Sequence, residues 1–220
     1  MRQLFLDLLP DSPPSLDNFV AGVNGEVLDA LTAWLSGALR DTAFCLHGEA
    51  GCGKSHLLRA SGFPYIDAAE NPGLFGVKGR ATLAVDNVDR LDGDGQIALF
   101  ALFNQFKAGG GCLLTAAIQP PRHLALREDL RTRLGSGLIY RLQPLTDAEK
   151  AAALAAQARE RALKLAPESI DYLMRHASRD MRTLSALIVA LDHYTLEHQR
   201  PVTLPLLREL LVRESAPDVR

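Results

Sequence analysis

Short apolar runs alternate with stretches of helical periodicity over the first two thirds of the chain. The runs are bounded by polar turns and lie at 43–47, 64–66, 81–85, 112–116 and 138–142. Amphipathic segments with the spacing of helices lie between them, at 26–39, 54–60 and 96–107. Because buried strands that alternate with helices form parallel sheets covered on both faces, the pattern predicts an α/β domain.

The pattern changes after Pro144, where no further strand signal occurs. Thr146 and Glu149 have the spacing of a capping box, and helical segments follow at 150–163, 167–176, 181–198 and 204–212. Near the N-terminus, Pro13 and Pro14 disfavour helix and predict an extended tether. We therefore predict three parts: an arm and tether at 1–14, an α/β domain at 15–144 and a small all-α domain at 145–220.

Composition limits the classes of function. The 220 residues are 47% hydrophobic and 23% charged, with a net charge of -2, so the chain is globular and has no overall positive field for nucleic acid. Cys45, Cys52 and Cys112 lack the spacing of a zinc site or a disulfide framework, and no run approaches the roughly 18 apolar residues of a membrane span. We expect a cytoplasmic protein that has no membrane partner.

The strongest motif is GEAGCGKS, which fits G-x-x-x-x-G-K-[ST] between a predicted strand and a predicted helix. In such a P-loop, backbone N–H groups surround the phosphates, Lys54 reaches the β- and γ-phosphates, and the Ser55 hydroxyl ligates Mg²⁺. ATP or ADP is therefore the expected ligand. The predicted phosphate-binding residues are Gly48, Glu49, Ala50, Gly51, Cys52, Gly53, Lys54, Ser55 and, directly after the motif, His56.

A nucleotide triphosphate site also needs an acid near the Mg²⁺ ion. Asp86 directly ends the apolar run 81–85, and Asp89 is the competing candidate three residues later. We predict that Asp86, with Ser55, serves the metal. No histidine has the spacing of metal ligands.

Three further segments, taken with the P-loop, resemble the AAA+ ATPases of the DnaA branch. The resemblance covers about 15–212 and is carried by 16–24 upstream of the P-loop, by 131–138 and by 179–184. Within this branch, 139–145 (IYRLQPL) and 179–184 (RDMRTL) resemble the Hda family of DnaA-related regulatory inactivators more than DnaA. The chain extends only about 75 residues past the predicted boundary, so we expect a helical lid and no direct sequence-specific binding of DNA.

The resemblance implies roles for residues that their spacing alone would not assign. Asn18, Phe19 and Val20 would lie at the adenine side of the nucleotide. Arg133, in preference to Arg131, would be an arginine finger that acts on the nucleotide of a neighbouring protein. Arg182 would be the sensor 2 residue of the lid. Without the resemblance, these arginines read as solvated or salt-bridged surface residues.

Two positions depart from the AAA+ pattern. Asn87 follows Asp86 where these enzymes commonly carry an acid, and an amide cannot act as a general base. The sensor 1 region, 115–118, offers only Thr115 as a polar candidate. Both departures predict slow or absent intrinsic hydrolysis, with the bound nucleotide acting as an organiser.

The N-terminal arm resembles the QLxLxL-type peptide by which Hda proteins bind the β sliding clamp of DNA polymerase III. The alternative is a strand that packs on its own core. The predicted clamp-binding residues are Gln3, Leu4, Phe5, Leu6 and Leu8. One such peptide binds weakly, and self-association, which the sequence leaves open, would strengthen binding through multivalency.

Together these features predict a negative regulator of replication initiation. On this hypothesis the nucleotide-bound protein lies on a DNA-loaded clamp and presents Arg133 to ATP on DnaA. One alternative is an autonomous DnaA-like ATPase that acts as a helicase-loading or remodelling factor, with Asp89 or a water network replacing the missing acid. A second alternative is a plain adaptor that tethers another protein to the clamp.

Overall fold

The computed structural model describes residues 13–74, 76, 81–177 and 180–212, and the chain divides into two compact units. One unit is Pro13–Pro144, and the described part of the other begins at Leu145. The predicted α/β domain with a C-terminal all-α domain is confirmed. Among the described residues, no helix has the length and apolar character needed to cross a membrane.

The first unit is built on a five-stranded parallel sheet of order β2-β3-β4-β1-β5. Its strands are β1 (Ala43–His47), β2 (Tyr65–Asp67), β3 (Thr82–Asp86), β4 (Cys112–Ala117) and β5 (Leu138–Arg141). All strands run in the same direction, so their carboxyl ends lie at one edge of the sheet. In parallel sheets this edge is where ligands bind.

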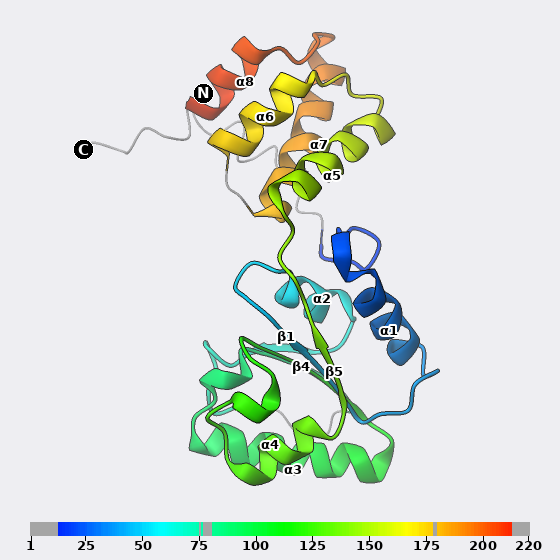
Figure 1. Ribbon diagram of the computed structural model, residues 1–220, viewed down its shortest axis with the longest axis vertical. Helices are drawn as coiled ribbons and strands as arrows, with labels where there is room; N and C mark the ends of the chain where they lie inside the picture. The colour runs from blue at the N-terminus through cyan, green and yellow to red at the C-terminus, as the bar shows by residue number, and fades with distance from the viewer. Residues whose placement is uncertain (1–12, 75, 77–80, 178–179, 213–220) are drawn as a thin grey trace, which may run out of the picture. The chain divides into compact units, whose positions relative to one another are not determined.

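Helices cover both faces of this sheet (Figure 1). The helical elements of the first unit are η1 (Gly22–Asn24), α1 (Gly25–Leu35), α2 (Lys54–Ala60), η2 (Val88–Arg90), α3 (Gly93–Gly109), η3 (Pro121–His123) and α4 (Glu128–Gly135). Alternate strand residues point to opposite faces: Phe44 and Leu46 pack in the core with α1 and α2, whereas Cys45 packs in the core with α3 and α4. Both cores are made almost entirely of aliphatic and aromatic side chains.

The first predicted helix is shorter than expected. We predicted 26–39, but α1 ends at Leu35 because Gly37 adopts φ +79° and the N–H groups of Ala38 and Leu39 both return to Ala33 O. This is the glycine-based termination typical of helix C-termini.

The second unit contains four helices in its described residues. They are α5 (Asp147–Glu160), α6 (Pro167–His176), α7 (Met181–His198) and α8 (Leu204–Val212), and they share a core of their own that includes Leu173 and Leu187. The capping box is present: Thr146 Oγ1 accepts the Glu149 N–H, and Thr146 N–H donates to Glu149 Oε2 at 2.8 Å. It places the start of α5 at Asp147, earlier than the predicted 150.

Candidate functional site

The P-loop connects β1 to α2 and depends on two glycines. Gly48 (φ +156°) and Gly53 (φ +100°) adopt conformations that other residues rarely adopt. A Cβ at Gly48 would lie 2.3 Å from Leu142 O, and one at Gly53 would lie 2.7 Å from the Phe19 ring. The close approach of the loop to these neighbours therefore requires glycine at both positions.

The Lys54 ammonium group lies inside the loop. Lys54 is buried, and its Nζ donates to Gly48 O at 2.7 Å and to Glu49 O at 2.8 Å. Cys52 Sγ lies 3.8 Å away. Ser55 is exposed in the first turn of α2. Two backbone carbonyl oxygens of the loop thus accept hydrogen bonds from the Lys54 ammonium group.

Asp86 ends β3 at the same edge of the sheet as the P-loop, with β4 between β3 and β1. Its side chain is buried, with 1% of the residue exposed. Tyr65 Oη donates to Asp86 Oδ2 at 2.9 Å, and the Asn87 N–H donates to Oδ1 at 2.9 Å. Each carboxylate oxygen therefore has one donor and keeps a lone pair for a further ligand.

Tyr65 is a residue of the site that sequence reasoning missed. It begins β2, and the Arg59 guanidinium of α2 lies 4.2 Å from the centroid of its ring. Burial raises the pKa of Tyr65 to about 12, and the charge of Asp86 acts in the same direction. The phenol is therefore protonated and can donate to Asp86 at neutral pH.

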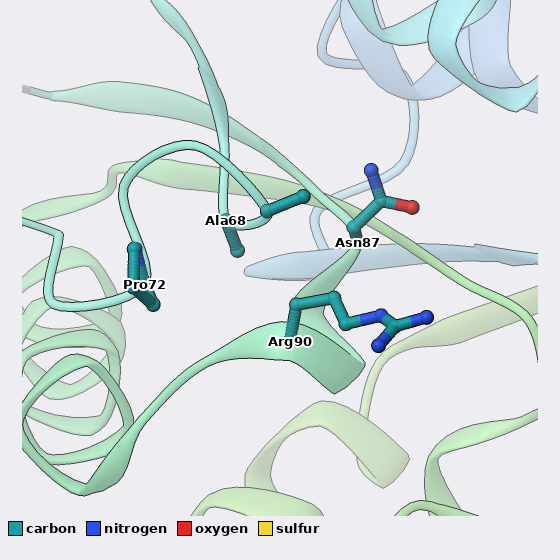
Figure 2. Close-up of a pocket in the computed structure, with 5 residues that line it drawn as sticks. Ala68, Pro72, Asn87 and Arg90 are labelled. Carbon is teal, nitrogen blue, oxygen red and sulfur yellow. The ribbon is translucent and has the colours of Figure 1, made fainter.

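Asn87 has a side chain that is already engaged. Its backbone is left-handed (φ +51°), and its Nδ2 donates to Asp67 Oδ1 at 2.8 Å, which also accepts the Ala69 N–H. Figure 2 shows Asn87 and Arg90 across from Ala68 and Pro72 in an open cavity of about 420 Å³. The amide thus bridges the ends of β2 and β3.

Asp89, the competing acid, lies in η2 directly after β3. Its Oδ1 is buried and has no hydrogen-bond partner within the described ranges, and its Oδ2 lies 3.7 Å from Arg90 Nε. Thr115 belongs to the core, because its buried hydroxyl donates to Cys45 Sγ at 3.0 Å. Burial raises the pKa of Cys45 to about 11, so this thiol is neutral.

The segment before the P-loop packs on the start of α2. The Phe19 ring lies 5.5 Å from the His56 ring, and His56 Nε2 lies 2.9 Å from Ser15 O. Asn18 is exposed and shapes its own turn, accepting the Ser15 N–H at 2.9 Å and donating to Pro13 O. Val20 is half-buried.

Asn24, which closes the segment 16–24 that resembles the AAA+ pattern, is buried and anchors this segment to the sheet. Its Oδ1 accepts the Gln143 N–H at 2.8 Å, and its Nδ2 donates to Gln143 O at 2.9 Å. These bonds tie the residue before α1 to the chain that leaves β5, and through it to the carboxyl edge of the sheet.

Three arginines at α4 differ in their partners. Arg127 donates twice to the Asp129 carboxylate, at 3.3 and 2.9 Å, and Arg131 Nη2 lies 3.5 Å from Glu128 Oε1. The half-buried Arg133 side chain makes no hydrogen bond or ion pair with any described residue. Of these three, only Arg133 is therefore uncommitted within the described part of the chain.

The remaining predicted site residues belong to other parts of the chain. Arg182 is exposed in the first turn of α7, in the second unit, where its N–H donates to the N-cap residue Asp180. The predicted clamp-binding residues of the arm lie outside the described residues. They are Gln3, Leu4, Phe5, Leu6 and Leu8.

The sheet order, the P-loop after β1, the acid at the end of β3 and the helical second unit define an AAA+ module with a lid. The structure is similar to domain III of DnaA from Thermotoga maritima, with a TM-score of 0.69, 22% identity, and coverage of 94% of this chain and 98% of that one. AMPPCP-bound DnaA from Aquifex aeolicus gives 0.64 and 23%, over 84% and 66% of the two chains. The branch migration motor RuvB of T. maritima gives 0.61 and 17%, over 93% and 72%.

Sequence comparison narrows the class. Residues 147–211 match the family model of the Hda lid domain. An uncharacterised protein of Haemophilus influenzae is 31% identical over 228 residues, which cover 96% of this chain and 98% of the relative. The chain belongs to the family of that relative and is an Hda-like, DnaA-related AAA+ protein.

Proposed function

We propose that the carboxyl edge of the sheet binds ATP or ADP. The glycine loop with no room for side chains at Gly48 and Gly53, and the enclosed Lys54 ammonium, support phosphate binding. The similar DnaA of A. aeolicus is described as bound to AMPPCP. In the segment ahead of the loop, Phe19 and its neighbours are the proposed contacts of the adenine.

The residues of this edge also fit Mg²⁺. Ser55 exposes a hydroxyl at the start of α2, and both oxygens of Asp86 keep a free lone pair. Oxygen donors of this kind suit Mg²⁺, which neutralises phosphate charge when it is bound. Ser55 and Asp86 are therefore the residues proposed to bind Mg²⁺.

The proposed function of the whole protein is to regulate replication initiation negatively. On this proposal the nucleotide-bound protein binds a DNA-loaded sliding clamp through its N-terminal arm and presents Arg133 to ATP bound by DnaA. The observation that carries the proposal is the uncommitted Arg133 guanidinium in a helix whose other arginine, Arg131, and whose N-cap residue, Arg127, are both ion-paired. An arginine finger needs a guanidinium that can leave its own chain and stabilise transition-state charge in another.

Asn87 supports a regulatory role over an autonomous one. An amide cannot take a proton from water, and this amide is already bonded to Asp67. Slow hydrolysis leaves the bound nucleotide in place as an organiser of the fold, and ADP suffices for that role.

The test measures conversion of DnaA-bound ATP to ADP in the presence of this protein, DNA-loaded clamp and ADP. Wild type is compared with Arg133→Ala, with Arg131→Ala as the matched control on the same helix, and with a variant lacking residues 1–9. We expect stimulation by wild type and Arg131→Ala. Loss of a finger removes about 10³-fold or more of a stimulated rate, so Arg133→Ala should fall to the basal rate, and the truncated variant should fail on the clamp.

Each alternative predicts a different result. An autonomous ATPase hydrolyses ATP rapidly by itself, loses that activity in Lys54→Ala and does not stimulate DnaA. An adaptor keeps full stimulation in Arg133→Ala and loses it in Gln3→Ala and Leu4→Ala. Either result would refute the proposal.

A further inference from the structure

A hydroxyl from outside the P-loop contacts the carboxylate proposed to serve Mg²⁺. Tyr65 Oη donates to Asp86 Oδ2 at 2.9 Å, and the backbone of Asn87 holds the other oxygen. Two donors on two different oxygens fix the rotation of a carboxylate group about its Cβ–Cγ bond. The orientation of Asp86 therefore depends on Tyr65 as well as on the main chain.

Tyr65 is itself held on several sides. It lies on β2, paired in register with Ala84 of β3, and its ring packs against the apolar core formed with α1 and α2. The Arg59 guanidinium lies over the ring at 4.2 Å from its centroid. Stacking of this kind restricts the ring and keeps the hydroxyl directed at Asp86.

The phenol donates this hydrogen bond in its neutral form, which is the ordinary state of a tyrosine side chain at neutral pH. Asp86 thus receives a hydrogen bond without a second negative charge beside it.

We propose that Tyr65 is a positioning residue for Asp86, which it orients toward the Mg²⁺ ion of a bound nucleotide. The proposal rests on the proposed nucleotide site. Tyr65 contacts neither nucleotide nor metal in this scheme and acts only through the carboxylate. Outer hydrogen-bond partners of metal ligands act in this way, and their loss weakens metal binding.

The test measures ADP binding by the full chain in EDTA and in a Mg²⁺ titration. Tyr65→Phe removes the hydroxyl and keeps the ring, and Tyr140→Phe makes the same change on β5, where the ring stacks on Phe44 at 5.1 Å. Asp86→Asn gives the reference for a lost carboxylate. We expect Tyr65→Phe to raise the half-saturating Mg²⁺ concentration about 10-fold, at the low end of such outer-partner effects. Its ADP affinity in EDTA should equal that of wild type, and Tyr140→Phe should match wild type in both.

The outcomes distinguish a failure of the Tyr65 role from a failure of the proposed nucleotide site. If wild type binds ADP without any dependence on Mg²⁺, or does not bind ADP, the proposed site is wrong. If Asp86→Asn loses the Mg²⁺ dependence while Tyr65→Phe binds Mg²⁺ as tightly as wild type or more tightly, only the role of Tyr65 is overturned. Equal losses in EDTA and in Mg²⁺ would show that Tyr65 supports the fold and does not position the carboxylate.

Discussion

The donor and the acceptor of the hydrogen bond between Asn87 and Asp67 can be exchanged by a double substitution. At present Asn87 Nδ2 donates to Asp67 Oδ1 at 2.8 Å. In Asn87→Asp two carboxylates meet at this contact, whereas in the exchange Asn87→Asp with Asp67→Asn an amide again faces a carboxylate. Asp67 Oδ1 now accepts both the Asn87 Nδ2 and the Ala69 N–H, so an amide at position 67 that donates to residue 87 leaves the exposed Ala69 N–H to water, at little cost. We expect the exchange to recover most of the stability that Asn87→Asp loses.

The distance between the side chains at positions 67 and 87 sets the size of the repulsion expected in Asn87→Asp. Two unit charges about 3 to 4 Å apart at an effective dielectric of about 20 repel by roughly 4 to 6 kcal/mol. Both residues are half-buried, so hydration and uptake of a proton by one carboxyl reduce the cost of Asn87→Asp to about 2 kcal/mol. Asp67→Asn loses a charge-assisted bond worth about 1 kcal/mol more than a neutral one. The exchange should cost under about 1 kcal/mol, so the coupling is about 2 kcal/mol.

The assay is urea unfolding of wild type, the two single variants and the exchange. Trp34, the only tryptophan, is 2% exposed in the first unit and reports its unfolding by fluorescence. If the loss of unfolding free energy in the double variant equals the sum of the two single losses, the two side chains are not coupled and the reasoning is wrong. The exchange also places an acid directly after Asp86, and we expect its ATP hydrolysis to exceed that of wild type; equal rates would show that the amide is not what limits hydrolysis.

Three further predictions concern stability. The Cβ of Gly51→Ala meets open space, so this variant should lose only about 1 kcal/mol of unfolding free energy, the cost of a left-handed φ. The Cβ of Gly48→Ala also collides with Leu142 O, so this variant should lose about 2 kcal/mol more in urea unfolding. Equal losses in the two variants would show that there is no collision at Gly48. Asn24→Ala leaves the Gln143 N–H and C=O without partners and should cost about 2 to 4 kcal/mol, and a loss under about 1 kcal/mol would show that water replaces it. The pKa of His47 is held below 6.5 by burial and then by the charges of Arg141, Lys54 and Arg122, so the unfolded chain takes up its proton first as the pH falls. The contribution of a neutral His47 is therefore present above about pH 6.5 and lost below it, and His47→Gln should flatten the decline in unfolding free energy between about pH 7 and 5.

Local pattern was sufficient for most of the fold. Each of the five strands overlaps one of the predicted apolar runs, and the P-loop and Asp86 are defined by residues within a few positions of one another. Helix α4 was not predicted, because only Leu130 and Leu134 bury their side chains among its charged residues. A single pair of apolar positions is too weak a periodic signal for a helix of this length.

The contacts that complete the site depend on the tertiary fold. Tyr65 and Asp86 are 21 residues apart, and Asn24 and Gln143 are 119 apart. Which strand lies beside which decides these pairs, and periodicity within one segment carries no information on strand order. The same holds for Asn87, whose chemistry was predicted from its residue type but whose partner, Asp67, lies on the neighbouring strand.

The carbonyl bonds of Lys54 have a consequence for selectivity among anions. Any anion that recruits this ammonium must first replace its contacts with Gly48 O and Glu49 O. The loss is the same for every ligand, but the compensation is not: inorganic phosphate offers one set of oxygens, whereas a nucleotide adds a second phosphate, a ribose and a base. Because this cost lowers the affinity for every anion by the same factor, a ligand with few other contacts falls below useful affinity first, and we expect inorganic phosphate to bind far more weakly than a nucleotide, whose further contacts offset the loss.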